Sequence, residues 1–120
     1  MRLLICGDRR WNDRQLVRET LKKHLKEHEV KAIIHGDARG ADSIGWQEAH
    51  KLWPTAIEIK HPANWVFYGK GAGLVRNREM LTIGKPNLII AFSPNIIESV
   101  GTTNMLTLAE DNNIDYALVP

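Results

Sequence analysis

Glycines and charged side chains gather in four short stretches of the sequence: GDRRW (7–11), HGDARGAD (35–42), YGKGAG (68–73) and FSPNIIESVGTT (92–103). Glycine permits sharp bends and close approach of the backbone to a ligand. Free backbone N–H groups at the start of a helix favour an anion, and arginine or lysine beside them adds positive charge. These residue types predict a binding site for a phosphate-bearing small molecule.

Each glycine stretch taken alone is also explained by ordinary turn formation. GKGAGL (69–74) does not match the GxGxxG pattern, because its last position is Leu74, and it lacks the lysine-serine or lysine-threonine ending of a Walker A loop. The prediction of a phosphate site therefore depends on the recurrence of such stretches after successive strands.

Short apolar runs that alternate with helical patterns place these stretches in a fold. The predicted strands are 3–6, 31–34, 55–59, 87–92 and 116–119, and the predicted helices are 13–28, 41–53, 73–84 and 102–112. TAIEI (55–59) alternates in polarity, which indicates an edge strand, whereas nearly continuous apolar strands are typical of a parallel sheet. We predict one compact Rossmann-like α/β domain over residues 1–120, with about five mostly parallel strands and helices on both faces. Ligands bind beyond the carboxyl ends of such strands.

The overall composition is that of an ordinary globular protein, with 43% hydrophobic and 25% charged residues. The net charge of +2 gives no electrostatic reason to expect a nucleic-acid or membrane partner. The single cysteine, Cys6, cannot form an internal disulfide, and no apolar run approaches the roughly 20 residues of a membrane span. We expect a cytoplasmic protein with no membrane partner.

Several of these motifs, taken in order, resemble one known family. GDRRW, HGDARGAD, PANWVFYGKGAGLVRNREM (62–80) and GTTNM (101–105) are similar to the small stand-alone SLOG-domain proteins of bacteria and phages, the YspA-like group. This group is related to the LOG, or lysine-decarboxylase-like, proteins. The resemblance implies a Rossmann-like fold, a pocket for a nucleotide or nucleotide-derived ligand, and assembly into homo-oligomers.

The comparison with the LOG branch fails at its catalytic carboxylate. Those enzymes release a base from a nucleoside 5′-monophosphate, using an Arg from an RKxxM-like stretch and a Glu from a PGGxGTxxE stretch. Here Arg76 and Met80 match, but Asn77 replaces the Lys and Met105 stands at the position of the Glu. A thioether cannot stabilise an oxocarbenium-like state or activate water. Arg76 is the one catalytic candidate, and the carboxylates that could replace the Glu are Asp8, Asp37, Asp42 and Glu79.

The predicted layout assigns roles to the binding residues. Glycines allow close backbone approach, Thr102 offers its hydroxyl and amide to a phosphate, and Arg76 pairs with that phosphate. Arg9 or Lys70 adds charge, and Trp65 or Trp11 stacks on a base, although core packing is the favoured alternative for Trp11. The full set of predicted ligand-binding residues is Gly7, Arg9, Gly36, Ala38, Gly40, Asp42, Trp65, Lys70, Arg76, Asn77, Gly101 and Thr102.

Two members of this set have purely structural alternatives. Asn77 either bonds a ribose hydroxyl or caps its own helix turn, and Asp42 either serves the ligand or caps the helix that begins beside it. Elsewhere, His24 and His28 have a metal-binding spacing but no identifiable third ligand, so we predict no metal site.

A second stripe, Trp46, His50 and Trp53, runs along the predicted helix 41–53. We expect it to form a homo-oligomer interface, because large apolar groups exposed on a helix mark an interaction surface. The alternative is that the irregular segment 60–72 folds over these side chains.

Three functions remain open on the sequence alone. The first is binding or sensing of a nucleotide-derived ligand, with no further cofactor identified. The second is cleavage or transfer at a nucleotide's glycosidic bond by a displaced carboxylate. The third, single-stranded DNA binding, is opposed by the low net charge and the lack of a basic stripe.

Overall fold

Five strands form one parallel sheet, in the order β3-β2-β1-β4-β5, in the computed structural model, which describes residues 1–120. The strands are β1 (Arg2–Gly7), β2 (Ala32–His35), β3 (Ile57–Lys60), β4 (Leu88–Phe92) and β5 (Asp115–Val119). The chain runs outward from β1 through β2 and β3, then returns to β4 on the other side of β1. Strand order therefore reverses between β1 and β4, where a sheet of this kind leaves a crevice at its carboxyl edge. The predicted fold is confirmed, and TAIEI does contribute an edge strand, β3.

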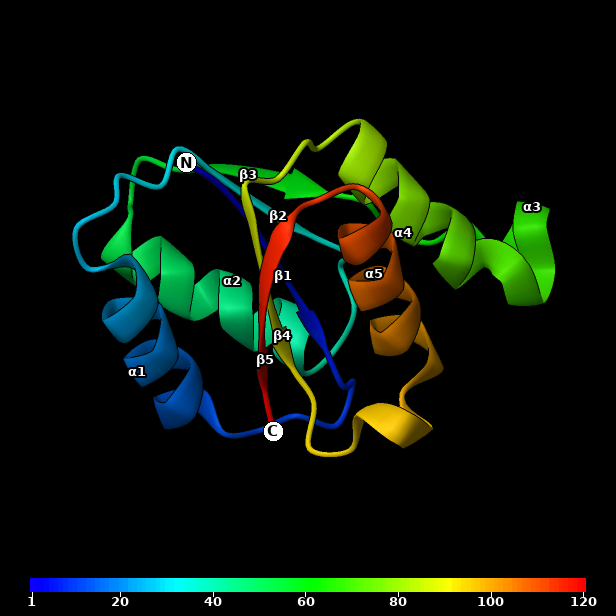
Figure 1. Cartoon of the computed structure of the whole chain (residues 1–120), viewed down its shortest axis with the longest axis horizontal. Helices are drawn as coiled ribbons and strands as arrows, with labels where there is room; N and C mark the ends of the chain where they lie inside the picture. The colour runs from blue at the N-terminus through cyan, green and yellow to red at the C-terminus, as the bar shows by residue number, and fades with distance from the viewer.

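Two pairs of helices cover the two faces of the sheet (Figure 1). One face carries α1 (Arg14–Leu25) and α2 (Ala41–Leu52), and the other carries α4 (Ala72–Thr82) and α5 (Val100–Asp111). The short elements are α3 (Trp65–Tyr68) and two 3-10 turns, η1 (Gly69–Gly71) and η2 (Ile96–Glu98). No helix is both long enough and apolar enough to cross a membrane.

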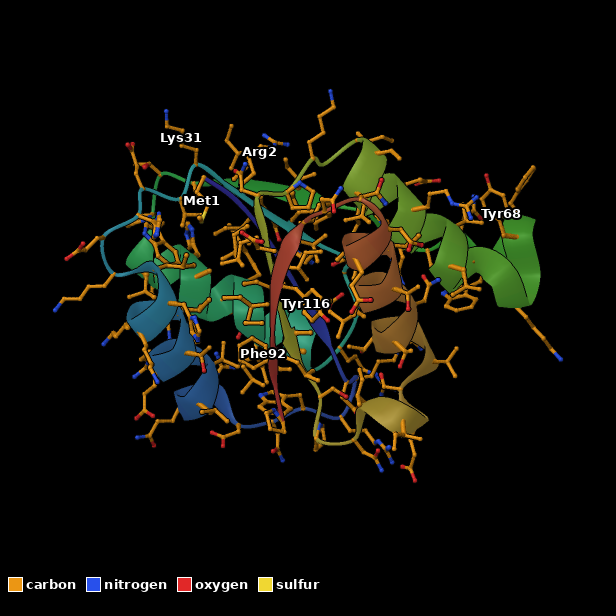
Figure 2. The ribbon with its side chains drawn as sticks, in the orientation of Figure 1. Met1, Arg2, Lys31, Tyr68, Phe92 and Tyr116 are labelled. Atoms are coloured by element: carbon orange, nitrogen blue, oxygen red, sulfur yellow. The ribbon has the colours of Figure 1, made fainter.

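The central strands divide their side chains between two cores. Leu3 and Ile5 of β1 pack with α1 and α2, whereas Leu4 and Cys6 pack with α4 and α5. This alternation follows from the period of two along a strand, and it explains why the strand reads as continuously apolar. Fully burying a Leu or Ile side chain contributes roughly 1.5–3 kcal/mol to the stability of the fold. The buried side chains of β1 therefore fix the position of the loop that follows it. In Figure 2, Phe92 of β4 lies inside, whereas Tyr68 lies at the outer end of α3.

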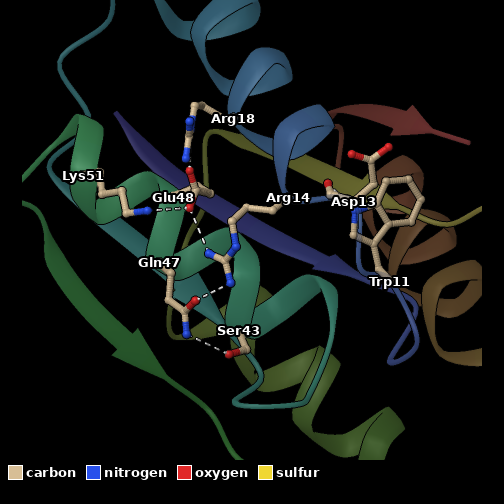
Figure 3. A network of polar contacts seen from close by, with 8 residues as sticks. All are labelled: Trp11, Asp13, Arg14, Arg18, Ser43, Gln47, Glu48 and Lys51. Atoms are coloured by element: carbon tan, nitrogen blue, oxygen red, sulfur yellow. Dashed lines mark hydrogen bonds and ion pairs between the residues drawn. The ribbon is translucent and has the colours of Figure 1, made fainter.

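A buried carboxylate joins α1 to α2 (Figure 3). The Glu48 side chain is 0% exposed, and it accepts hydrogen bonds from Arg18 Nε at 2.7 Å, Arg14 Nη1 at 2.9 Å and Lys51 Nζ at 3.0 Å. Burial alone would raise the pKa of Glu48, but these three cations outweigh that effect and lower its pKa to about 2. The pair of helices is therefore held by charge as well as by apolar packing.

The structure moves the ends of several predicted elements, such as α1, which ends at Leu25 and not at 28, and β3, which begins at Ile57 and not at 55. Two further corrections are more consequential. The segment 60–72, read as irregular, contains α3 and η1, which lie at the outer end of α4 and away from α2 (Figure 1). They therefore do not cover the stripe of Trp46, His50 and Trp53. Instead, Trp46 stacks between His35 and His50, and both tryptophans of the stripe are half-buried against the core beneath α2. The homo-oligomer stays a prediction.

The second correction concerns the start of α5. The helix begins at Val100 rather than at Thr102, because Ser99, with φ −99° and ψ 87°, is the last extended residue before it. Valine and glycine have low intrinsic helix propensity, which is why the pattern placed the start too late. The earlier start matters for the site, because it changes which backbone amides lie in the first turn.

Candidate functional site

A cavity of about 540 Å³ lies at the carboxyl edge of the sheet, where strand order reverses. Its walls come from the β1–α1 and β2–α2 connections, from α3, η1 and α4, and from the β4–α5 connection with the start of α5. All but two of the predicted ligand-binding residues line it: Gly7, Arg9, Ala38, Asp42, Trp65, Lys70, Arg76, Asn77, Gly101 and Thr102. The two outside it are Gly36 and Gly40. Four loops far apart in sequence therefore meet around one space.

The first turn of α5 carries the free hydrogen-bond donors of this cavity. No side chain caps the helix, and the backbone N–H groups of Val100, Gly101 and Thr102 have no partner in the chain. The fourth amide, that of Thr103, bonds to the Ser99 carbonyl at 2.9 Å. Unpaired amides at a helix N-terminus, together with the helix dipole, favour a bound anion. This end of the cavity is suited to a phosphate.

Arg76 of α4 projects into the cavity as a half-buried guanidinium. Its Nη1 donates to the Gly36 carbonyl at 2.9 Å and its Nε to Asn77 Oδ1 at 3.2 Å, while Nη2 has no partner in the chain. Burial lowers the pKa of Arg76, nearby Asp42 raises it, and Arg9 lowers it again. The side chain is thus fixed in position and keeps one free nitrogen for an anion.

The β2–α2 connection, which contains HGDARGAD, uses its amides internally. Asp42 Oδ2 accepts from the backbone N–H of Gly36 at 3.0 Å and of Ala38 at 3.3 Å. His35 Nδ1 accepts from the N–H of Asp37 at 3.0 Å, while its Nε2 lies 2.7 Å from Glu58 Oε2. The three amides are therefore not available to a ligand. Asp42 also does not cap its helix: the N-cap is Gly40, with no side-chain bond.

The glycines of these loops are required by packing within the protein. A side chain at Gly40, where φ is +70°, would run into the backbone of Asp8 and Arg9. A Cβ on Gly36 would meet the Arg76 guanidinium and lie 2.9 Å from Asp42 Oδ2. Gly7, with φ +147°, lets β1 approach the backbone of Phe92. Gly101 is different, because a Cβ there would meet nothing within 4 Å.

Sequence comparison places these loops in a known family. The YspA, cpYpsA-related SLOG family (YAcAr) matches residues 1–68, which include GDRRW and HGDARGAD. The chain belongs to this family. A relative in this comparison is the "Gene 61 protein" of Mycobacterium phage D29, which is 36% identical over 118 residues, covering 94% of this chain and 91% of the phage protein. No solved structure matches the chain. Membership of the SLOG family suggests a nucleotide-related role.

Every hydrogen bond of the Asn77 side chain in this SLOG domain is to another residue of the protein. Its side chain is buried, and Nδ2 donates to the Gly101 carbonyl at 3.0 Å and to Asn104 Oδ1 at 3.1 Å. It does not cap its own turn, and a bond to a ribose hydroxyl stays a prediction, because Asn77 does line the cavity. Instead it ties α4 to the first turn of α5, holding Arg76 beside the free amides. Thr102 is also buried, and its hydroxyl hydrogen-bonds that of Ser99 at 2.8 Å.

The two tryptophans considered for base stacking have different surroundings. Trp11 is 8% exposed, packs 5.4 Å from Phe92 between ring centroids, and belongs to the core, as its packing alternative predicted. Trp65 is 48% exposed, lines the cavity, and has the Arg9 guanidinium 5.5 Å from its ring centre. Trp65 is therefore the aromatic surface available to a ligand.

Three carboxylates line the cavity: Asp8, Asp42 and Glu98. Burial raises the pKa of Asp42, but its Oδ2 already accepts hydrogen bonds from two backbone amides, and this engagement makes it poorly placed to act as a base. Asp37 and Glu79, the other sequence candidates, are not among the lining residues. Met105 is, so the LOG Glu position does face the cavity but carries a thioether. No group of three or more His, Cys, Asp or Glu side chains is placed to hold a metal ion.

The sequence prediction missed Glu98, Ser99 and Val100, which all line the cavity. They lie inside FSPNIIESVGTT, but the predicted helix start at Thr102 left them outside the first turn of the helix. The signal that could have found them is Ser99, since serine is a preferred residue just before a helix. Arg10 was passed over for Arg9 in the same way, although both line the cavity.

Proposed function

We propose that this protein binds a nucleotide or nucleotide-derived ligand through its phosphate, at the N-terminus of α5. The observation that carries the proposal is the meeting of two independent features at one cavity. The unpaired amides of Val100, Gly101 and Thr102 lie on one side, and the free Nη2 of Arg76 belongs to the other. Amides and a fixed guanidinium together provide charge-assisted hydrogen bonds from two directions.

The remaining lining residues fit the rest of a nucleotide. Arg9, Arg10 and Lys70 add positive charge to the cavity, which favours a ligand with more than one negative charge. The exposed ring of Trp65 provides a face for a base. A volume of about 540 Å³ lies within the usual range for small-molecule sites, roughly 300–1,000 Å³.

Binding without turnover is the function we favour over glycosidic cleavage. Met105 supplies no carboxylate, and Asp42 is occupied by the backbone of its own loop. Asp8 is the carboxylate that keeps the alternative open, because it lines the cavity and only its Oδ1 is engaged, by the amide of Arg10 at 2.7 Å. If the protein is a hydrolase, Asp8 is the group that activates water.

Thermal unfolding in the presence of nucleoside mono- and diphosphates, NAD, ADP-ribose and cyclic dinucleotides tests the proposal. A ligand at about 100 times its Kd stabilises the fold by roughly 2.7 kcal/mol, which corresponds to a rise in Tm of roughly 10 °C for a domain of this size. Arg76→Ala should abolish the rise. The matched control is Arg78→Ala, an exposed arginine on the same helix that does not line the cavity.

Chromatography of the incubated ligand separates the two functions. Recovery of intact ligand after binding supports a binding or sensing module. Release of a base that Asp8→Asn prevents would replace it with the hydrolase. If none of these compounds raises the Tm of the wild-type protein, the phosphate site is refuted.

A further inference from the structure

A second, smaller hollow of about 250 Å³ adjoins the main cavity. The two share four lining residues, Arg9, Ala38, Trp65 and Arg76. The other walls of the smaller hollow come from the β2–α2 connection and from the residues just before α3, and they include Arg39. Arg9 and Arg76 therefore border both spaces, with the free amides of α5 bordering only the larger one.

Positive charge around the smaller hollow is not balanced within the protein. It is lined by three arginines, Arg9, Arg39 and Arg76, and by a single carboxylate, Asp37. None of these four side chains takes part in any ion pair of the chain. Arg9 instead lies over the ring of Trp65, and Arg76 donates only to neutral oxygens, of Gly36 and Asn77.

The crowding of guanidinium groups is costly because Arg76 is partly withdrawn from water. Burial lowers its pKa and Arg9 lowers it further, whereas Asp42 raises it. Asp42 offsets part of this repulsion, and burial of its own carboxyl group works against that by raising its pKa. An anion in either hollow would offset the repulsion, and one in each would do so on both sides of Arg9 and Arg76.

We propose that the smaller hollow is a second anion subsite, so that the ligand is a nucleotide with two separate anionic groups. One group lies at the first turn of α5 and the other lies beside Arg39, with Arg76 and Arg9 between them. This inference rests on the proposed function, because the first group is the phosphate bound at α5. A nucleoside monophosphate fills only the larger cavity and leaves Arg39 without a partner.

Calorimetric titration of the four ribonucleoside 5′-monophosphates and the corresponding 3′,5′-bisphosphates tests this subsite. For the base that binds best, the bisphosphate should bind at least about tenfold more tightly than the monophosphate, since a charge-assisted hydrogen bond is worth about a factor of ten or more. Arg39→Ala should remove this advantage and leave the monophosphate affinity within about twofold of wild type. Arg39→Lys should keep part of the advantage, because it retains the charge.

Arg78→Ala is the control for the loss of one positive charge, and it should change neither affinity, because Arg78 lines neither hollow. The melting curve of each variant without ligand should match that of the wild type, because Arg39 is an exposed loop residue. Equal affinities for both classes of nucleotide would overturn the subsite, and so would an Arg39→Ala variant that keeps the advantage or loses affinity for both classes equally. In each of those cases the phosphate site at α5 stands. If neither class binds the wild-type protein, both proposals fail.

Discussion

Two strand-to-helix connections at the same edge of the sheet, β2–α2 and β4–α5, differ in whether side chains hold their loop amides. In the first, Asp42 and His35 accept hydrogen bonds from the first three amides after β2, whereas the amides of Asp42 and Ser43 in the first turn of α2 have no partner in the chain. In the second, the amides of Val100, Gly101 and Thr102 have no partner, and these three residues line the cavity. Both contain glycine and acidic or hydroxyl residues, so their local composition looks alike.

The difference shows how side chains can make the amides of a strand-to-helix loop unavailable to a ligand. A side chain that accepts from the loop amides closes the loop on itself, and the loop then serves to position other groups. HGDARGAD does this for Arg76, which donates to the Gly36 carbonyl and lies against the bare Cα of Gly36. The β4–α5 connection has hydroxyls as well, but those of Ser99 and Thr102 bond each other and leave the amides free. One connection is a support and the other is the candidate binding surface.

The largest expected effect is the loss of the support when Asp42 is removed. Asp42→Ala leaves the amides of Gly36 and Ala38 unpaired, which should cost about 3 kcal/mol of unfolding free energy, measured in urea. Asp42→Asn keeps an acceptor oxygen for the amides of Gly36 and Ala38, so its cost should stay below about 1 kcal/mol.

Ser99→Ala is the matched change in the β4–α5 connection, where it removes a hydroxyl but no amide partner. It should cost less than about 1 kcal/mol. Equal losses for Asp42→Ala and Asp42→Asn would show that charge, and not amide pairing, holds the β2–α2 connection.

A second expected effect is acid sensitivity on the side of the sheet that α2 covers. The pKa of Glu48 falls from 4.5 to about 2 on folding, so its contribution is present above pH 4.5 and is lost as the pH falls toward 2. One pKa unit is about 1.4 kcal/mol, and partial exposure of the three cations reduces the total to about 2 kcal/mol. Urea unfolding across this pH range should show a shallower decline for Glu48→Gln, which has no titrating group. A slope identical to that of wild type would mean that other carboxylates dominate the acid response.

The smallest expected effect on stability is at the start of α5, where a substitution should nevertheless weaken ligand binding. Val100→Pro removes one of the free amides, and proline is tolerated at the first position of a helix when the preceding residue is extended, as Ser99 is. The unfolding free energy should change by less than about 0.5 kcal/mol, while the affinity for a phosphate ligand should fall about tenfold. Val100→Ala keeps the amide and should bind like the wild type. Unchanged affinity in the proline variant would place the phosphate elsewhere in the cavity.

Local pattern was enough to predict the elements and their arrangement. Apolar runs such as LLIC and NLIIAF are buried between two helical layers, and the polarity of TAIEI marks it as an edge strand, as the structure confirms. The glycine stretches lie at the carboxyl edge because every connection from a parallel strand into a helix must start there. Most of the predicted ligand-binding residues therefore line one cavity, although the prediction used no information on contacts.

Partners far apart in the sequence decided the rest. Gly36 and Gly40 are glycines because Arg76, Asp8 and Arg9 pack against them, and Asn77 is committed to the backbone of Gly101. The short helix at Trp65, which presents a ring to the cavity and to Arg9, has no periodic pattern of its own. Sequence alone thus determined the sheet, its covering helices and the edge that carries the cavity, since these depend on spacing along the chain. Only the tertiary structure decided which amides stay free, because that depends on which side chains lie close enough to accept hydrogen bonds from them.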